Sequence, residues 1–411
     1  MVKTIVYVGG FELPDKNAAA QRVLNNARVM RAIGHRVVLL GISHTRPYDR
    51  KLHPADAGGD DLEAWEIGYP AGRGDWFDHI LADWSIRALA ENGIVAPGEL
   101  SAVICYNYPA VAQWRIARLA RKWGAAAIAD CTEWYGRRPW TSLANIVKNV
   151  DVPLRMLWVN RRMDGLITTS PYITEFYRPT GLPIVEIPTL MDRPDEVSPS
   201  IAVGEGEAAI PISLFAVASG FAEGTRAEDV HDRIDWTLEL LDAVATRAGD
   251  FVLRIAGVGR ERYLSTFPAH GGLLDRLGER VIFLDRIPRV ELLRQLQASA
   301  FAFVLRHESR VTMAGFPSKY SEAVTYGTPC IINALPSVRA YHVEGKTGFT
   351  IDPGDRDEAE RRLYEILTMD VEAIMAMKRY CRGCGAFNAE AFKDQVTAFM
   401  SALNGDEGAC P

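Results

Sequence analysis

Short apolar, β-branched runs alternate with stretches of helical period along most of the chain. The sequence opens with "TIVYVGG" (4–10), continues with a helical stretch over 17–33, and returns to "HRVVLLG" (35–41). Buried parallel strands are apolar throughout, so this alternation predicts parallel sheets covered by helices on both faces. We therefore expect an α/β fold. Further strands are expected in this half at 102–106, 126–130, 165–170 and 183–188.

The alternation of strand-like and helical stretches is interrupted once, at 192–211. The segment "DRPDEVSPSIAVGEGEAAIP" is rich in Pro, Gly, Ser and acidic residues and has no apolar period, which is typical of a linker and exposed loop. The alternation of strand-like and helical stretches then resumes. A chain of 411 residues is also too long for one ordinary hydrophobic core, which favours two domains. Strands are expected at 212–220, 250–259, 280–285, 300–306, 329–333 and 348–352.

We predict two Rossmann-like domains. They are an N-terminal domain over 1–192 and a C-terminal domain over 211–388, separated by a linker at 193–210. The remaining segment, 389–411, begins with an amphipathic helix that we expect to pack back on the N-terminal domain. Residues 42–100 are too irregular to interpret.

Composition and charge argue against several classes of protein. A formal net charge of −6 argues against nucleic acid as a partner. No apolar run approaches the roughly 18 residues of a spanning helix, and "MVKTIVYVGG" reads as a strand instead of a signal peptide. Six cysteines do not make a disulfide framework in so long a chain, and Cys381 and Cys384 form a lone C-x-x-C without a second pair for zinc. We expect a cytoplasmic protein with no metal and no cofactor.

Ligands of open α/β sheets bind outside the carboxyl ends of the strands, so the loops there are the candidate sites. Gly9 and Gly10 follow the first strand and permit close approach of a phosphate, although a plain tight turn explains them equally well. Ser219 and Gly220 follow the first strand of the second half. Arg233 begins the next helix, where phosphates favour the helix N-terminus and a guanidinium group; a solvated loop is the alternative.

Two more candidates lie further along. Arg306 ends the strand "AFAFVLR" and must face a crevice or a partner, because burying it unpaired would cost several kcal/mol. Lys319 and Glu322 lie three apart in "GFPSKYSEAV", where a helix starting near Ser318 places them on neighbouring turns. A lysine in a first helical turn opposes the helix dipole unless an anion sits there. A surface ion pair remains the alternative.

Three stretches resemble one known family. "GFPSKYSEAVTYGTPCII" (315–332), the opening region 9–41 and "DGLITTSPYITEFYRPTGLPIVEIPTLMD" (164–192) are similar in content and order to retaining glycosyltransferases of family 4 and their relatives, the glycosyl transferases group 1. The resemblance implies the GT-B fold, in which two Rossmann-like domains face each other across a cleft. The sequence departs from the family at Ala314, where a glutamate is usual, and at His231, where a lysine is usual.

The resemblance implies a role for each candidate. Glu322 would bind the ribose hydroxyls of a nucleotide sugar, and Lys319 and Arg306 would face its diphosphate or sugar. Gly9 and Gly10 would approach the same phosphates from the N-terminal domain. The remaining donor-side residues are Ser219, Gly220, Arg233, and Arg286 and Ile287 beside the base. In the loop after 126–130, Asp130 and Glu133 are candidates for a catalytic role near the transferred sugar.

A basic, aromatic stretch extends over 137–162, where Asp151 is the only acid. It is suited to an anionic membrane or a phosphorylated acceptor, and a solvated helix face is the alternative. The family resemblance implies a metal-independent, retaining hexosyltransferase. It would move a sugar from a nucleoside-diphosphate sugar to a glycan, lipid-linked or small-molecule acceptor, in the cytoplasm or at the inner membrane face. The alternatives are a sugar-nucleotide epimerase of the same fold and a degenerate nucleotide-sugar-binding protein.

Overall fold

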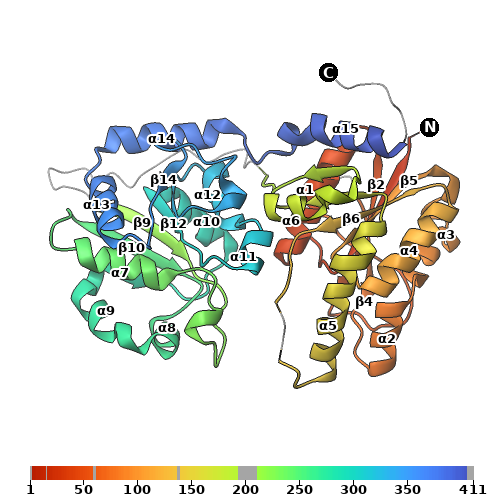
Figure 1. The fold of residues 1–411 in the computed structure, drawn as a ribbon, viewed down its shortest axis with the longest axis horizontal. Coiled ribbons are helices and arrows are strands. Elements are labelled where there is room, and N and C mark those ends of the chain that lie inside the picture. Colours follow the sequence, from red (N-terminus) through yellow and green to blue (C-terminus); the bar gives the residue numbers. More distant parts are fainter. Residues whose placement is uncertain (1, 15, 59–61, 137–138, 193–210, 405–411) are drawn as a thin grey trace. The chain divides into compact units, whose positions relative to one another are not determined.

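The computed structural model describes residues 2–14, 16–58, 62–136, 139–192 and 211–404. The expected linker at 193–210 lies outside these residues. The chain divides into two compact units, which are described separately (Figure 1). Unit 1 comprises residues 1–191, 314–316 and 388–411, and unit 2 comprises residues 192–313 and 317–387.

Unit 1 is built on an eight-stranded sheet in the order β3-β4-β2-β1-β5-β6-β7-β8. Neighbouring strands are parallel except for β3 and β4. The central strand β1 is buried along its whole length, as its uninterrupted apolar sequence predicts. The strands are β1 (Thr4–Gly9), β2 (Arg36–Ser43), β3 (His53–Pro54), β4 (Glu63–Gly68), β5 (Leu100–Tyr106), β6 (Ala126–Cys131), β7 (Gly165–Thr168) and β8 (Ile184–Glu186).

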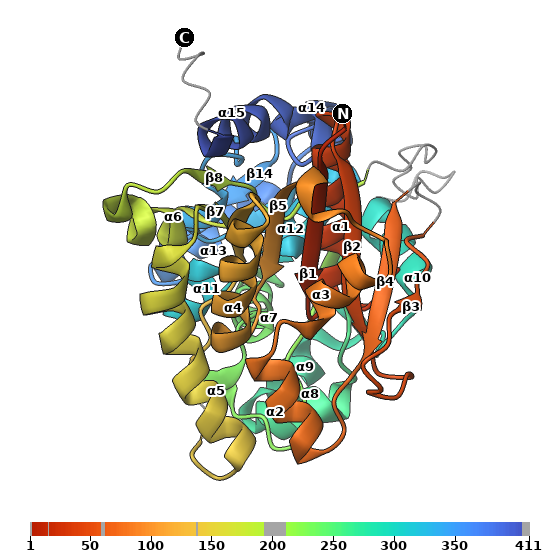
Figure 2. The same ribbon diagram turned by 90° about the vertical axis from the view of Figure 1, so that its right-hand side faces the viewer.

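The helices of unit 1 come from both ends of the chain. They are α1 (Ala18–Ala32), α2 (Arg73–Leu81), α3 (Trp84–Glu91), α4 (Ala110–Lys122), α5 (Leu143–Leu154), α6 (Pro171–Tyr177) and α15 (Lys393–Asn404). Helix α15 packs against α1 and β8, as predicted for the C-terminal helix (Figures 1 and 2). The packing is close, because a Cβ at Gly165 would lie 2.9 Å from the ring of Phe399.

Unit 2 is built on a six-stranded, all-parallel sheet in the order β11-β10-β9-β12-β13-β14. Its strands are β9 (Ile212–Val217), β10 (Phe251–Ala256), β11 (Val281–Phe283), β12 (Phe301–Val304), β13 (Cys330–Ile332) and β14 (Gly348–Thr350). Its helices are α7 (Ile234–Val244), α8 (Arg260–Thr266), α9 (Gly271–Leu277), α10 (Arg289–Ala298), α11 (Arg310–Ala314), α12 (Ser318–Thr325), α13 (Arg356–Leu367) and α14 (Val371–Cys384). The predicted α/β class is confirmed.

Two details differ from the sequence-based expectation. Several strands end earlier than predicted: β9 ends at Val217 and β12 at Val304, so the residues that follow are loops that carry polar groups. The segment 42–100, which the sequence left without interpretation, contains β3, β4, α2 and α3. Helix α2 buries none of its residues and β3 has only two, so neither produces a strong periodic signal.

The cysteines are mostly core residues. Cys105, Cys131 and Cys330 are buried, as predicted, and in the C-x-x-C on α14 Cys381 is buried whereas Cys384 is exposed. Across the described ranges, no group of three or more His, Cys, Asp or Glu side chains is arranged to hold a metal ion. None of the helices in those ranges is both long enough and apolar enough to cross a bilayer.

Candidate functional site

The sheet of unit 2 reverses its strand order at β9. From β9 the chain builds β10 and β11 on one side, then crosses back and places β12 on the other side (Figure 1). In open α/β sheets the crevice at such a switch point is the usual ligand site. Ser219 follows β9 and Arg306 follows β12, so both predicted residues lie at this position.

Asp232 is the centre of a charged cluster there. Its carboxylate accepts hydrogen bonds from the Ser219 hydroxyl and the Lys319 ammonium, and Arg306 Nε lies 3.7 Å from its Oδ1. Only 9% of the residue is exposed. Burial alone would raise the pKa of Asp232, but the charges of Lys319 and Arg306 outweigh burial and lower it. We call these four residues the Asp232 cluster.

Lys319 joins helix α12 to the end of β9. Its Nζ donates to the carbonyl oxygen of Val217 at 2.7 Å and to Ser219 Oγ at 3.1 Å. The residue before the helix is Pro317, which offers no capping side chain. The lysine is therefore held at the crevice by contacts with the sheet, and helix capping does not explain the motif.

Glu322 lies one turn further along α12. Its Oε1 is 2.9 Å from Arg289 Nη2, at the start of α10, and its side chain is largely buried. A carboxylate so placed can accept hydrogen bonds from two neighbouring hydroxyl groups. Arg289 was not singled out from the sequence, and neither was Asp232, because a pairing between distant loops leaves no local pattern.

The other donor-side candidates lie in loops and at a helix start of unit 2. Arg233 pairs with Asp235, with Nε 2.9 Å from Oδ1, and stacks over the ring of Trp236. Gly220 has a φ of +86°, which favours glycine. Arg286 is exposed and Ile287 is half-buried in the loop after β11. The pKa of His231 is lowered by burial and by the charge of Arg306, which disfavours a further cation beside Lys319 and Arg306.

In unit 1, Gly9 is required by packing. A Cβ at this position would lie 2.7 Å from Cβ of Tyr106 on the neighbouring strand β5. Gly10 is exposed, and a Cβ there would find its nearest neighbour, Ile42 Cδ1, at 4.0 Å. Gly10 is therefore the position with room for a ligand, whereas Gly9 keeps β1 and β5 together.

Asp130 lies in a buried network. It is 1% exposed, pairs with Arg22 at 2.8 Å, and accepts a 2.5 Å hydrogen bond from the Tyr7 hydroxyl. Burial and the neighbouring Asp130 charge raise the pKa of Tyr7, so its hydroxyl keeps its proton and donates. Arg22 also donates to the carbonyl oxygen of Ile187. Asp130 thus ties β6 to α1 and to the end of β8, while Glu133 is half-buried in the following loop.

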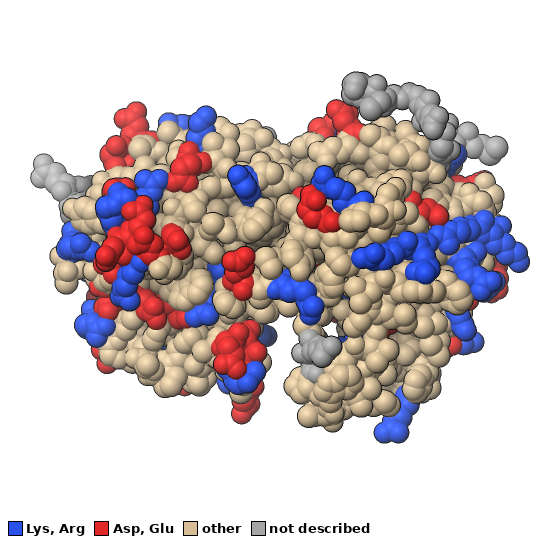
Figure 3. Space-filling view, viewed as in Figure 1, with Lys and Arg blue, Asp and Glu red and all other residues tan. Residues whose placement is uncertain are grey.

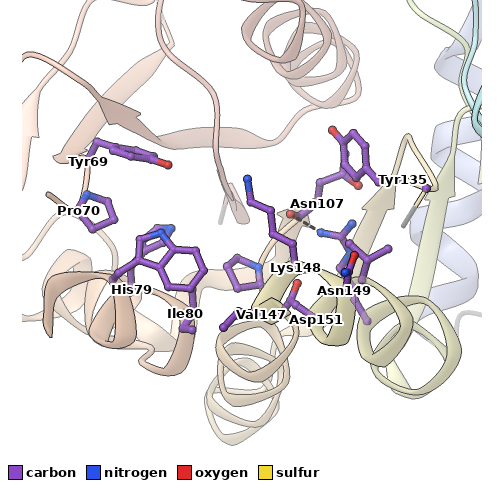
Figure 4. Close-up of a pocket in the computed structure, with 15 residues that line it drawn as sticks. Tyr69, Pro70, His79, Ile80, Asn107, Tyr135, Val147, Lys148, Asn149 and Asp151 are labelled. Atoms are coloured by element: carbon purple, nitrogen blue, oxygen red, sulfur yellow. Dashed lines mark hydrogen bonds between the residues drawn. The ribbon is translucent and has the colours of Figure 1, made fainter. Parts of the chain in front are cut away.

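A pocket of about 300 Å³ opens in unit 1 beside α5 (Figure 4). It lies at the carboxyl ends of β4, β5 and β6 and was not predicted, because part of its wall comes from the segment 42–100. Its lining residues are Tyr69, Pro70, Trp76, His79, Ile80, Asn107, Pro109, Tyr135, Gly136, Val147, Lys148, Asn149, Asp151, Val152 and Arg155.

The family model of the glycosyl transferases group 1 matches residues 224–369, which include Asp232, Arg306, Lys319 and Glu322. Residues 224–369 form a glycosyl transferases group 1 domain. The match covers less than half of the chain, and a comparison with curated protein sequences finds no significant match.

Solved structures similar to this protein cover nearly the whole chain. Sucrose-phosphate synthase from Thermosynechococcus elongatus has a TM-score of 0.65 at 15% identity, covering 98% of this chain and 100% of its own. The catalytic domain of starch synthase IV from Arabidopsis thaliana, bound to ADP and acarbose, has a TM-score of 0.64 at 12% identity, with coverages of 98% and 99%. Anabaena HepE, in complex with UDP and glucose, has a TM-score of 0.60 at 13% identity, with coverages of 97% and 100%. These likenesses confirm the predicted GT-B fold.

Proposed function

We propose that the protein is a glycosyltransferase that moves a hexosyl group from a nucleoside-diphosphate sugar to a glycan, lipid-linked or small-molecule acceptor. The observation that carries the proposal is the Asp232 cluster, which holds Lys319 and Arg306 at the switch point of a group 1 domain. Solved relatives of the same fold contain UDP or ADP, which supports a nucleoside-diphosphate donor. Retention and independence of metal follow from the family resemblance.

Each donor-side residue has a proposed task. Negative charge develops on the leaving diphosphate, and Lys319 and Arg306 stabilise it as preorganised cations. Glu322 accepts hydrogen bonds from the ribose hydroxyls, with Arg289 orienting its carboxylate. The loops with Ser219, Gly220, Arg233, Arg286 and Ile287 surround the phosphates and the base.

A thermal-shift panel with UDP, GDP, ADP, TDP and CMP tests the donor class. A ligand that binds only the folded state stabilises it by roughly 2.7 kcal/mol at a hundred times its Kd. We expect a shift with one nucleoside diphosphate and much smaller shifts with the others. No shift with any nucleotide would contradict a nucleotide-sugar donor.

Glu322→Ala is expected to weaken binding of the selected nucleotide by at least about tenfold, because two hydrogen bonds of about 1 kcal/mol each are lost. Titration calorimetry of the folded variant measures the affinity. Glu358→Ala, at an exposed position on α13, is the matched control and should bind as the unmodified protein does. Equal affinities in all three proteins would refute the role of Glu322.

A degenerate nucleotide-sugar-binding protein is the second candidate, favoured by Ala314 and His231 at positions where the family carries a glutamate and a lysine. Such a protein would bind the nucleotide but release none from the nucleotide sugar. A sugar-nucleotide epimerase would convert the sugar and release no free nucleoside diphosphate during productive turnover. Release of nucleoside diphosphate that depends on an acceptor therefore separates the proposed transferase from both alternatives.

We further propose that unit 1 rests on an anionic membrane through α5. Five apolar side chains, Leu143, Ile146, Val150, Leu154 and Leu157, are exposed and recur at spacings of three and four, so they share one side of the helix and its extension; we call them the α5 face. Lys and Arg side chains gather nearby over α4, while the described surface over α5 in this view carries few charged side chains (Figure 3). An apolar helix face with adjacent basic residues is typical of an interfacial helix.

The double variant Ile146→Glu/Val150→Glu is expected to lower binding to vesicles of phosphatidylglycerol and phosphatidylcholine by about tenfold or more, because two apolar groups no longer enter the interface. Co-sedimentation measures the bound fraction. Val371→Glu, at an exposed position on α14 of unit 2, is the control. Failure of the unmodified protein to sediment with these vesicles would overturn the membrane proposal and leave the donor site untouched.

A further inference from the structure

The pocket beside α5 contains an arginine whose hydrogen-bonding groups are only partly used. Arg155 is 5% exposed, and its Nη1 donates to the carbonyl oxygens of Asn107 at 2.7 Å and Tyr108 at 3.4 Å. The first of these bonds is the dashed line at Asn107 in Figure 4. Its Nε and Nη2 are buried and have no hydrogen-bond partner among the described residues. Burying unpaired hydrogen-bond donors of a charged group costs free energy, so we expect a ligand to supply the acceptor for these atoms.

His79 brings a second unused polar atom to the same pocket. Its Nδ1 is buried and has no hydrogen-bond partner within the described part of the chain. Burial lowers the pKa of His79, which keeps the ring neutral at pH 7 and leaves Nδ1 able to hydrogen-bond a ligand. His79 lies on the α2 side of the pocket. The side chain of Lys148, on α5, extends into the space between His79 and Asn107 (Figure 4).

The charges that line the pocket favour an anion. Among the described residues that line it, Lys148 and Arg155 are basic and Asp151 is the only acid. The Asp151 carboxylate is already used, because its Oδ1 accepts a 2.7 Å hydrogen bond from the backbone N–H of Ala110 at the start of α4. The pKa of Asp151 is raised by burial, which further weakens its opposition to an anionic ligand.

The wall of the pocket also offers ring surfaces. Tyr69 and Trp76 line it together with the imidazole of His79, and Tyr69 and His79 lie on the side opposite Asn107 (Figure 4). Aromatic faces provide large rigid contact areas for a ring-shaped ligand, while the polar groups fix its orientation. The pocket thus combines ring contacts with a buried, partly unused guanidinium group.

We propose that this pocket binds an acidic sugar through a carboxylate or phosphate group, with Nε and Nη2 of Arg155 as paired donors to two oxygens of the anion. A planar guanidinium group is suited to such a bidentate contact. That this sugar is the acceptor of transfer rests on the proposed function. The recognition of the anion itself does not depend on it.

Titration calorimetry tests the proposal with three probes: methyl glucuronide, glucose 6-phosphate and the uncharged methyl glucoside. We expect one of the two anions to bind at least about tenfold more tightly than methyl glucoside, since a charge-assisted pair contributes more than a neutral hydrogen bond. Whichever anion binds identifies carboxylate or phosphate as the recognised group. Arg155→Met is expected to remove the preference, and Arg155→Lys to restore only part of it. Arg87→Met, at an exposed position on α3, is the control.

Equal binding of the anions and methyl glucoside, or no binding of any probe at millimolar concentration, would overturn the proposal. An undiminished preference in Arg155→Met would do the same. If Arg155→Met does not fold, His79→Phe is tested in its place, because it keeps an aromatic ring and removes Nδ1. We then expect His79→Phe to bind the anion more weakly than the unmodified protein does. The thermal-shift panel with nucleotides tests the donor site independently of this calorimetry. A protein that binds no nucleotide and a protein that binds no acidic sugar therefore give different results.

Discussion

Replacing Arg22 with methionine is expected to destabilise unit 1 by about 3–5 kcal/mol, because the substitution leaves Asp130 buried with its charge uncompensated. Arg22 pairs with Asp130 and also donates to backbone oxygens at the end of β8, so several contacts are lost together. Urea unfolding followed by tryptophan fluorescence measures the loss, since every tryptophan except Trp236 lies in unit 1. Arg31→Met, at an exposed position on the same helix, should change stability little.

Variants of the same network distinguish a structural role for Asp130 from a catalytic one. If Asp130 is a structural group, Asp130→Asn lowers stability and the double variant with Arg22→Met recovers part of the loss, because no unpaired charge remains. A catalytic Asp130 would instead show a large fall in turnover with stability nearly unchanged. The burial of its carboxylate between Arg22 and Tyr7 favours the structural role, so we expect the first result.

Lys319→Met is expected to lower kcat for release of nucleoside diphosphate from the nucleotide sugar by about 100-fold, the usual effect of removing one preorganised group that stabilises developing charge. Affinity for the bare nucleoside should stay within about twofold, since a nucleoside carries no phosphate for Lys319 to contact. Hydrolysis of the donor by water has the same leaving group as transfer and measures the effect without knowledge of the acceptor. Equal losses of affinity for nucleoside and nucleoside diphosphate would exclude Lys319 as a phosphate ligand.

Loss of the lysine also leaves Asp232 with one cation fewer, so Lys319→Met is expected to lower stability as well as turnover. The double variant Lys319→Met/Asp232→Asn separates the two effects. We expect it to recover stability and to remain slow, because the cluster no longer holds an uncompensated carboxylate but still lacks the ammonium group. Recovery of turnover in the double variant would mean that the lysine acts only through the fold. Lys346→Met, at an exposed position of unit 2, is the control.

The fold was predictable because buried parallel strands leave uninterrupted apolar runs in the sequence. The runs at β1 and β12 are of this kind. The same reasoning failed in the segment 42–100, where β3 is a two-residue strand and α2 buries no side chain. An element whose residues are at most half-buried has only a weak apolar period, so the three-dimensional arrangement is needed to reveal it.

Several donor-side candidates were found because they follow a strand, a position that the sequence marks directly. Arg306 was chosen in this way, whereas Lys319 was chosen by its spacing from Glu322 at the start of an expected helix, and the structure brings Arg306 and Lys319 to Asp232. Asp232 itself and Arg289 were missed, because a carboxylate or guanidinium in a loop gains meaning only from a partner distant in sequence. The pocket around Arg155 was missed for the same reason, since its walls come from four separate segments.

Helix α15 gives the chain an unusual order of parts. Because residues 388–404 pack with α1 and β8, the polypeptide leaves unit 1 after residue 191, builds unit 2, and returns to complete unit 1. In evolutionary and engineering terms, unit 2 is an insertion within unit 1. A cut near residue 192 does not release a complete N-terminal fragment, because the surface at Gly165 would lose Phe399 and Leu403. An independently folding unit 1 would need α15 joined to β8 by a new connection that bypasses unit 2.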